Sequence, residues 1–273
     1  MPFTLAHPAA AVPLFRPLQR FGVLSALLIG SMTPDFPYFL TGDLTRNQSH
    51  SFAGLFYFCL PYGVIAYLLF HFILKHPLIA LLPGAIQGRV LGVCPVLWRL
   101  PTQNWGAVLV SLLAGAATHV IWDSFTHPGE TIVQAVVPLR TYLFSFQGAR
   151  FYVFNLLQHS STVAGIALLA WWGTRWLRKT PVTPLALPFS LPVAARVLVI
   201  ASCVTIAAYD FLEVAALALY QSVSLIRLRH WVGPAVTTAM AHVGIAVIVY
   251  GILWNIAALR CMRRAEKPAA AAI

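Results

Sequence analysis

The sequence predicts an all-α, polytopic integral membrane protein: a helical bundle of about five to six spans with short interfacial or re-entrant helices. Of its 273 residues, 59% are hydrophobic and 9% are charged, whereas soluble domains carry about 25% charged residues. Several apolar runs also reach the ~20 residues that a helix needs to cross a bilayer. These runs are Ser51–Leu74, Gly106–Phe125, Phe151–Trp172, Ala194–Tyr220 and Val232–Leu259.

Three weaker segments lie beside these runs. The apolar run Phe21–Met32 is short, and it could cross with help from its flanks, re-enter or lie shallow. Pro77–Leu100 and Thr131–Phe146 carry Pro, Gly, Arg and Gln, which favours interfacial helices or loops.

The order of these segments suggests four regions. Residues 1–179 form a His- and Asp-rich membrane core with the expected metal site, and a Pro-rich linker follows at residues 180–192. Residues 193–260 are expected to form a pair of helices, and residues 261–273 a cytoplasmic tail.

The net charge of +11 is placed between the apolar runs, without a basic stripe interleaved with aromatic residues. It therefore indicates topology and attraction to anionic lipid rather than nucleic-acid binding. The lipid bilayer is the expected partner. The Lys and Arg bias places the C-terminus in the cytoplasm and the polar motifs described next toward the non-cytoplasmic face.

The stretch "ATHVIWDSFTHPGE" spaces His119, Asp123 and His127 four residues apart at the end of an apolar run. Ionisable groups within spans are costly and usually serve a function. On a helix, His119 and Asp123 share one face. They are plausible zinc ligands, and Asp123 could bridge two ions. His127 is expected just past the helix end, before Pro128. The alternative is an Asp–His hydrogen bond that closes the helix end.

More side chains of the same types lie near ends of apolar runs: His7, Asp35, His50 and His159. Each alone has an ordinary interpretation as a turn, cap or interfacial residue. Together with the preceding motif, they suit Zn²⁺ or a mixed Zn/Mn/Fe pair. If Phe21–Met32 crossed the membrane, His7 and Asp35 would lie on opposite faces. If His7 is a metal ligand, it must meet Asp35, and this run should then re-enter or the N-terminal arm should thread into the cavity.

The segments "MPFTLAHPAA", "IGSMTPDFPYFL", "SHSFAGLFYFCLPYGV", "THVIWDSFTHP" and "LQHSSTVAGI" resemble the bacterial membrane family catalogued as domain of unknown function 4184. The resemblance covers nearly the whole chain and implies the bacterial cytoplasmic (inner) membrane.

A weaker resemblance rests on the order His, Asp, His, His-x3-Asp and a later His. It is to predicted membrane-bound metal-dependent hydrolases and to the all-helical zinc-dependent phospholipase C and single-strand nuclease enzymes. It implies the metal ligands His7, Asp35, His50, His119 and Asp123, with His127 or His159 after them. The amine and tryptophan ligands of those enzymes have no counterpart, and the position four residues after His159 is Val163 instead of Glu. One or two ions are therefore expected.

These observations lead to the expectation of a membrane-embedded metal-dependent hydrolase that cleaves a phosphoester, a lipid among the candidates, through a metal-activated water. Asp123, His127 and His159 would carry the catalysis. One alternative is a transporter or channel-like cation or proton pathway, to which Asp210, Glu213 and His242 would contribute. The other is a structural partner protein whose His and Asp side chains hold helices together.

Overall fold

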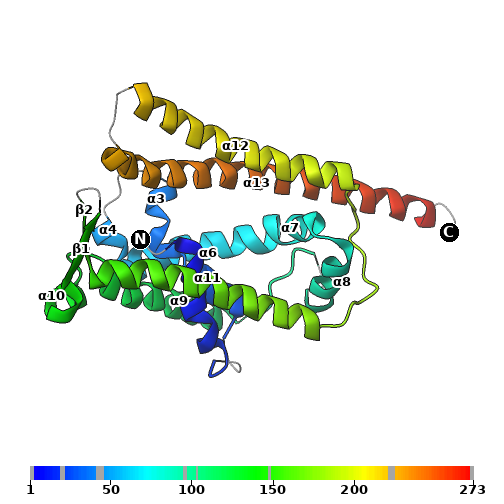
Figure 1. Cartoon of the computed structure of the whole chain (residues 1–273). Coiled ribbons are helices and arrows are strands. Elements are labelled where there is room, and N and C mark those ends of the chain that lie inside the picture. Colours follow the sequence, from blue (N-terminus) through cyan, green and yellow to red (C-terminus); the bar gives the residue numbers. More distant parts are fainter. Residues whose placement is uncertain are drawn as a thin grey trace. The chain divides into compact units, whose positions relative to one another are not determined.

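The computed structural model describes residues 3–18, 22–40, 46–94, 97–102, 104–146, 149–220 and 225–270. It confirms the all-α prediction, because helices dominate and the described part holds five that are long and apolar enough to cross a membrane (Figure 1). These helices cover Phe52–Leu81, Trp105–Ala135, Val153–Lys179, Val193–Leu217 and Val232–Ala265. The protein is therefore built as an integral membrane protein.

The chain forms two compact units. The first comprises Met1–Tyr67, Pro101–Arg175 and Ser224–Arg229, and the second comprises Leu68–Leu100, Trp176–Val223 and His230–Ile273. The short elements before the first span are η1 (Thr4–Ala6), α1 (Pro8–Ala11), η2 (Val12–Phe15), α2 (Leu24–Gly30), η3 (Thr33–Asp35), α3 (Pro37–Leu40) and α4 (Arg46–Ser49). The first span consists of α5 (Phe52–Gly54), the π-helical η4 (Leu55–Cys59), α6 (Leu60–Leu69), the π-helical η5 (Phe70–Leu74) and α7 (Lys75–Leu81).

The remaining elements follow in chain order. They are α8 (Gly84–Val93), α9 (Trp105–Thr126), α10 (Thr131–Ala135), η6 (Val137–Arg140), β1 (Tyr142–Phe146), β2 (Ala149–Tyr152), α11 (Val153–Lys179), α12 (Val193–Tyr220) and α13 (Leu225–Ala270).

The helix α9 carries the central motif and has well-defined ends. The Asn104 side chain accepts a hydrogen bond from the Ala107 amide at 3.2 Å and caps its first turn. The helix ends at Thr126, because His127 adopts an extended backbone before Pro128, a position at which proline disfavours helix. His127 thus lies just past the helix end, as the sequence predicts.

The helix α2 packs on α9 at two glycines. A Cβ at Gly30 would overlap the Leu112 carbonyl, and a Cβ at Gly115 would overlap the Leu27 carbonyl. Only glycine permits this approach of the two backbones. With seven residues, α2 is about 10 Å long, far short of the ~30 Å hydrocarbon core. The helix α2 is thus too short to span that core by itself. Phe21, where the predicted run begins, lies outside the described residues.

The first span continues through Pro77 to Leu81, beyond the predicted end at Leu74. Proline at position 77 prevents a regular hydrogen bond to the carbonyl four residues earlier, that of Ile73. The Asn255 side chain donates to this carbonyl at 2.9 Å. A neighbouring polar side chain thereby satisfies the backbone that proline leaves open, which is how membrane helices tolerate proline.

A β-hairpin replaces part of the predicted loop and the start of the predicted third span. The strands β1 and β2 pair antiparallel, with Phe144 opposite Phe151 and their rings stacked at 4.9 Å. Aromatic residues favour strands, where they pack across the pair. For this reason α11 begins at Val153 instead of Phe151.

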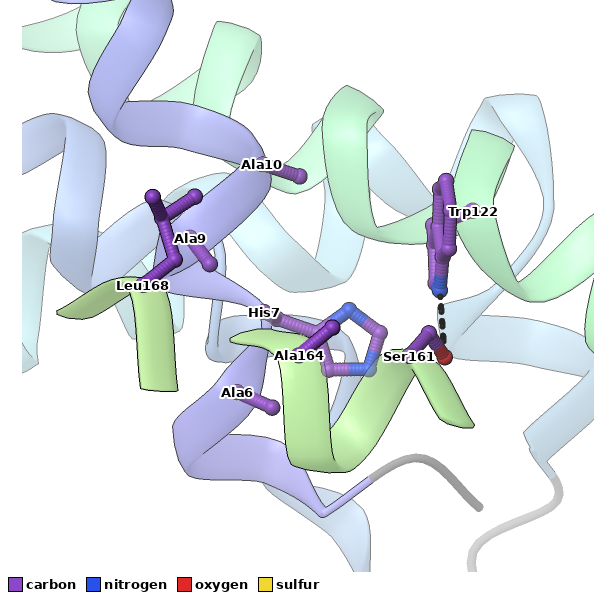
Figure 2. Close-up of a pocket in the computed structure, with 8 residues that line it drawn as sticks. All are labelled: Ala6, His7, Ala9, Ala10, Trp122, Ser161, Ala164 and Leu168. Carbon is purple, nitrogen blue, oxygen red and sulfur yellow. Dashed lines mark hydrogen bonds between the residues drawn. The ribbon is translucent and has the colours of Figure 1, made fainter. Parts of the chain in front are cut away.

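The N-terminal arm, Phe3–Phe15, packs within the first unit against α9 and α11. The Phe3 amide donates to the Thr162 hydroxyl at 3.2 Å. A Cβ at Gly165 of α11 would lie 3.1 Å from the Ala6 carbonyl oxygen, so glycine lets the arm approach the helix closely. A cavity lies beside the arm, between α1, α9 and α11 (Figure 2).

Candidate metal centre

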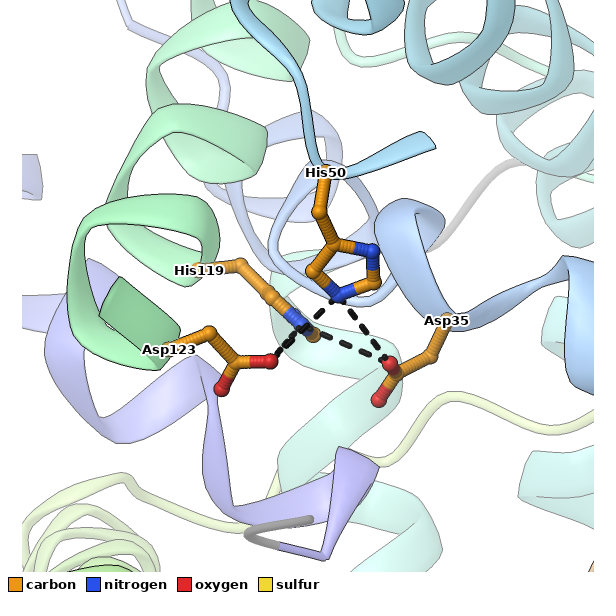
Figure 3. Close-up of side chains that lie close together, drawn as sticks. All are labelled: Asp35, His50, His119 and Asp123. Carbon is orange, nitrogen blue, oxygen red and sulfur yellow. Dashed lines mark ion pairs between the residues drawn. The ribbon is translucent and has the colours of Figure 1, made fainter. Parts of the chain in front are cut away.

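Four side chains from three parts of the first unit point to one place (Figure 3). Asp35 ends η3, His50 follows α4, and His119 and Asp123 lie one turn apart on α9. All four are buried, and their ligand-type atoms lie within 4.8 Å of one another. The structure therefore brings together four residues that the sequence spreads over almost 90 positions.

The contacts in this cluster have similar lengths. The Nε2 atom of His50 lies 3.6 Å from Asp35 Oδ1 and 3.3 Å from Asp123 Oδ2. The Nε2 atom of His119 lies 3.5 Å from Asp35 Oδ1 and 3.6 Å from Asp123 Oδ2. A direct charge-assisted hydrogen bond between nitrogen and oxygen would be about 2.7–2.9 Å. The side chains thus face one another across a space instead of bonding directly.

These lengths fit ligands around a zinc-sized ion. Zinc binds nitrogen and oxygen at about 2.0–2.2 Å, and a tetrahedron's edge is about 1.63 times that, or roughly 3.3–3.6 Å. All four measured nitrogen–oxygen distances fall in this interval. Two imidazoles and two carboxylates are also a ligand set that zinc accepts.

A contact at Nδ1 orients the imidazole of each of the two histidines, His50 and His119. The Nδ1 atom of His119 lies 2.8 Å from the Ser31 carbonyl oxygen, which accepts its hydrogen bond, and Nδ1 of His50 lies 3.0 Å from the Ser49 hydroxyl. Metal binding would require Nε2 of His119 to lose its proton, and the hydrogen bond at Nδ1 would then leave the Nε2 lone pair directed into the space between the carboxylates. Metal-binding histidines are typically held in this way by their second nitrogen.

Asp35 is held in the same manner. The Thr4 hydroxyl donates to Asp35 Oδ2 at 2.6 Å, while Oδ1 is buried and makes no hydrogen bond to any part of the chain that the structure describes. Burial alone would raise the pKa of Asp35, but the charge of protonated His119 and the Thr4 hydrogen bond outweigh burial and lower that pKa below its ordinary value. Asp35 is therefore a carboxylate at neutral pH.

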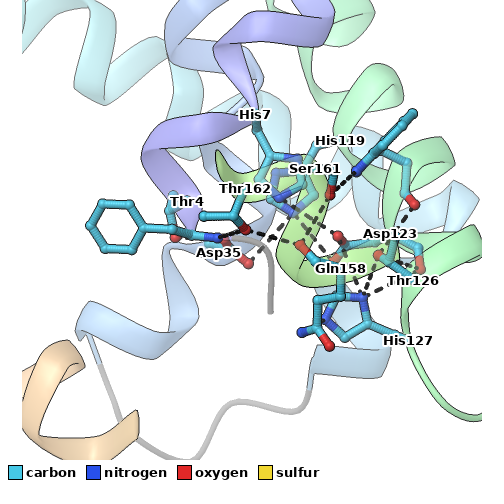
Figure 4. Close-up of polar contacts among 12 residues, drawn as sticks. Thr4, His7, Asp35, His119, Asp123, Thr126, His127, Gln158, Ser161 and Thr162 are labelled. Atoms are coloured by element: carbon cyan, nitrogen blue, oxygen red, sulfur yellow. Dashed lines mark hydrogen bonds and ion pairs between the residues drawn. The ribbon is translucent and has the colours of Figure 1, made fainter. Parts of the chain in front are cut away.

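His7 enters the cluster from the N-terminal arm (Figure 4). Its ring stacks on that of His119 at 3.5 Å, and its Nε2 lies 3.6 Å from Asp123 Oδ1. Neither ring nitrogen makes a hydrogen bond within the described residues, and only 3% of the residue is exposed. Burial, followed by the charge of His119, lowers the pKa of His7 to about 3. His7 is therefore a neutral imidazole with an available lone pair.

Asp123 divides its two oxygens between two groups of histidines. Oδ2 faces His50 and His119, while Oδ1 faces His7 and, at 3.5 Å, Nδ1 of His127. The His127 ring is also held locally, because its Nδ1 lies 3.3 Å from the Asp123 carbonyl oxygen. Through this division, one carboxylate oxygen of Asp123 faces each group of histidines and could contact an ion there.

His159 lies on α11, where it is exposed, and it does not reach the cluster. The adjacent Gln158 is buried instead, with its Nε2 3.5 Å from Nε2 of His127. Neighbouring residues on a helix point about 100° apart, so only one of the two can face the cluster. The structure thus places His159 outside the cluster, and its predicted catalytic role stays a prediction.

Sequence reasoning missed Thr4 and Gln158 as members of the site. A signal for Gln158 exists: Gln158, Ser161, Thr162 and Gly165 follow the i, i+3, i+4, i+7 spacing of one helix face. These small and polar residues interrupt an otherwise apolar span on the side that faces His127 and the arm. No comparable local pattern marks Thr4.

Comparison with known proteins gives one match. A family model described as "Domain of unknown function (DUF4184)" matches residues 1–253. No curated protein and no solved structure matches the chain.

Proposed function

We propose, from the premise that the chain belongs to the DUF4184 family, that the protein is a membrane-embedded metal-dependent hydrolase acting on a phosphoester. The observation that carries the proposal is the spacing of Asp35, His50, His119 and Asp123. Their four nitrogen–oxygen distances of 3.3–3.6 Å are those expected around a tetrahedral zinc ion.

Charge balance supports the same proposal. Asp35 and Asp123 place two carboxylates in a region with almost no exposed surface. Buried charges are costly unless they are paired or bind metal. One divalent ion would balance both carboxylates, and the neutral imidazoles would complete its ligand set. A second ion would use Asp123 Oδ1 with His7.

A metal ion bound here would supply a hydroxide at neutral pH and polarise a phosphoryl oxygen. The chain's own residues would do the rest. Thr4 and the Ser31 carbonyl fix the orientation of Asp35 and His119. Nε2 of His127 lies at the edge of the cluster, 3.5 Å from the donating Nε2 of Gln158. It would accept a proton from the attacking water and pass it to the leaving oxygen as the phosphorus–oxygen bond breaks.

The structural alternative fits the distances less well. Side chains that only hold helices together would make direct hydrogen bonds of about 2.7–2.9 Å, which the cluster's His–Asp distances exceed. The transporter alternative stays a prediction.

Five crossings would place the site at the non-cytoplasmic face of a bacterial inner membrane. With the C-terminus in the cytoplasm, alternating spans put both the residues before Phe52 and the Thr126 end of α9 on the outer side. His7, Asp35 and His50 would then lie on the same side as Asp123. This arrangement removes the conflict that a crossing at Phe21–Met32 would create.

Elemental analysis of detergent-purified protein tests the proposal. We expect one or two zinc, manganese or iron ions per chain, and hydrolysis of bis(p-nitrophenyl) phosphate that a chelator abolishes and added zinc restores. His119→Ala should lose both metal and hydrolysis, whereas His242→Ala, outside the cluster, should keep both. Protein without stoichiometric metal, or equal behaviour of the two variants, would overturn the proposal.

A further inference from the structure

A cavity of about 250 Å³ adjoins the cluster at His7. It is lined by Ala6, His7, Ala9, Ala10, Trp122, Ser161, Ala164 and Leu168 (Figure 2). We infer that this cavity binds a hydrocarbon chain of a membrane lipid whose phosphoester lies at the cluster. The inference rests on the proposed function and adds the substrate class, a lipid phosphoester.

The cavity offers an apolar wall and few polar partners. Besides His7, its lining consists of small or apolar side chains and the Ser161 hydroxyl. That hydroxyl accepts a hydrogen bond from Trp122 Nε1 at 3.2 Å and donates to the Gln158 carbonyl at 3.1 Å. A buried water molecule needs two to four polar partners. Because the lining offers few, it suits a hydrocarbon chain better than a row of water molecules.

Exposure falls from one end of the cavity to the other. Leu168 of α11 and Trp122 of α9 are 45% and 39% exposed, whereas His7 is 3% exposed. Both helices belong to segments long and apolar enough to cross the membrane. The cavity therefore leads from the apolar surface of these spans to the inner residue that touches the cluster.

One molecule could occupy both places. His7 lines the cavity, and its Nε2 lies 3.6 Å from Asp123 Oδ1. A phosphoryl group at Asp123 and a chain beside Ala9 could thus belong to the same lipid. The cavity is smaller than the ~300–1,000 Å³ of pockets that enclose drug-sized ligands, which favours part of one chain over a whole lipid.

Small residues create this space. Where the N-terminal arm meets α11, Ala6 and Ala9 lie against Gly165. Ala164 of α11 also lines the cavity and is exposed. A larger side chain at Ala164 would fill the cavity without entering the buried cluster.

Photo-crosslinking tests the inference. The probe is phosphatidylglycerol with a diazirine near the end of one acyl chain, mixed with full-length purified protein in detergent and mapped by mass spectrometry. In the wild type we expect label on the cavity residues of α11 and on Trp122. Ala164→Phe should reduce this label roughly tenfold, equivalent to ~1.4 kcal/mol of binding free energy. Val163→Phe is the matched control, because Val163 is 69% exposed and does not line the cavity.

The readouts separate this inference from the hydrolase proposal. Absence of label at the cavity in the wild type, or equal label in both variants, overturns the chain site even if the protein binds metal and cleaves bis(p-nitrophenyl) phosphate. Label that Ala164→Phe removes, on protein without metal, retains the chain site and overturns the lipid phosphoester as substrate. Metal content equal to wild type in Ala164→Phe, with the label lost, supports the inference, because it shows that the cluster still folds.

Discussion

Aspartate and histidine meet in two regions of this protein, with different geometry. In the second unit, Asp210 of α12 and His242 of α13 touch directly: Nδ1 of His242 lies 3.0 and 3.1 Å from the two carboxylate oxygens. Among the described residues of the first unit, six such contacts measure 3.3–3.6 Å, and four of them join the buried side chains of Asp35, His50, His119 and Asp123. The pair in the second unit is therefore hydrogen-bonded directly, whereas the side chains in the first unit face one another across a space that could hold an ion.

Burial separates the two regions as well. The His242 side chain is 53% exposed and has one acidic partner, whereas His119 has no exposed surface and faces two. Glu213, a further candidate of the second region, is exposed. The comparison teaches that residue type alone does not separate a hydrogen-bonded pair from a candidate metal site. The contact lengths, their convergence and the hydrogen bonds that orient each imidazole separate the two.

The largest effect is expected from Asp123→Asn. Loss of an outer partner of a metal ligand costs about 10–100-fold in metal affinity, and loss of the bridging carboxylate should exceed that. Elemental analysis and metal titration measure the change. Asp210→Asn, the same substitution in the second region, should keep the metal. If both variants retain it equally, the distinction between the regions fails.

Thr4→Val is expected to have the next largest effect. It removes the hydrogen bond to Asp35 Oδ2 while keeping the size of the side chain. Metal affinity should fall about 10-fold, as for other partners that orient a ligand. Competition with a chromophoric chelator measures the affinity. The control is Thr237→Val, which removes a hydroxyl that donates to the Pro234 carbonyl, away from the cluster. Unchanged affinity in Thr4→Val would mean that the contact with Asp35 does not hold the site.

Gly165→Ala tests whether the N-terminal arm packs against α11. Alanine in a helix normally gains about 0.5–1 kcal/mol over glycine, as expected for Gly173→Ala, where a Cβ would meet nothing within 4 Å. At Gly165 the Cβ would press on Ala6, so this variant should be about 1 kcal/mol less stable than Gly173→Ala. Thermal unfolding measures the difference. Equal stability of Gly165→Ala and Gly173→Ala would show that the N-terminal arm does not pack against α11.

The smallest effect is expected for the second region itself. Asp210→Asn keeps the shape of the side chain and a hydrogen bond to His242, so stability should change by about 0.5–1.5 kcal/mol. Unfolding in detergent measures it, and proton flux in liposomes tests the transporter alternative. Flux that depends on Asp210 would give the pair a function that its geometry does not suggest.

Some of the site could be predicted from residues close in sequence. His119 and Asp123 share a face because a helix repeats every 3.6 residues, and Pro128 sets where that helix ends. The apolar runs identify the spans because a bilayer requires their length. In each case a local rule is sufficient. Where two local rules compete, as at Phe151 between strand and helix, the predicted boundary was displaced by two residues.

The choice between His159 and Gln158 required the tertiary structure. Both lie on α11, and composition favours histidine as the functional residue. Packing against the arm and His127 decides which face of the helix turns inward, and it buries Gln158. No spacing within one helix determines how that helix is rotated against its neighbours.

The amino-acid sequence by itself determined the membrane setting, the positions of the spans and the set of imidazole and acidic candidates, because these depend on local composition and helical periodicity. Only the tertiary structure decided that His7, Asp35 and His50 meet the α9 pair. That meeting depends on the close approach of α2 and α9 at Gly30 and Gly115 and on the fold of the N-terminal arm. Contacts between distant segments come from the packing of the whole unit, which local patterns do not encode.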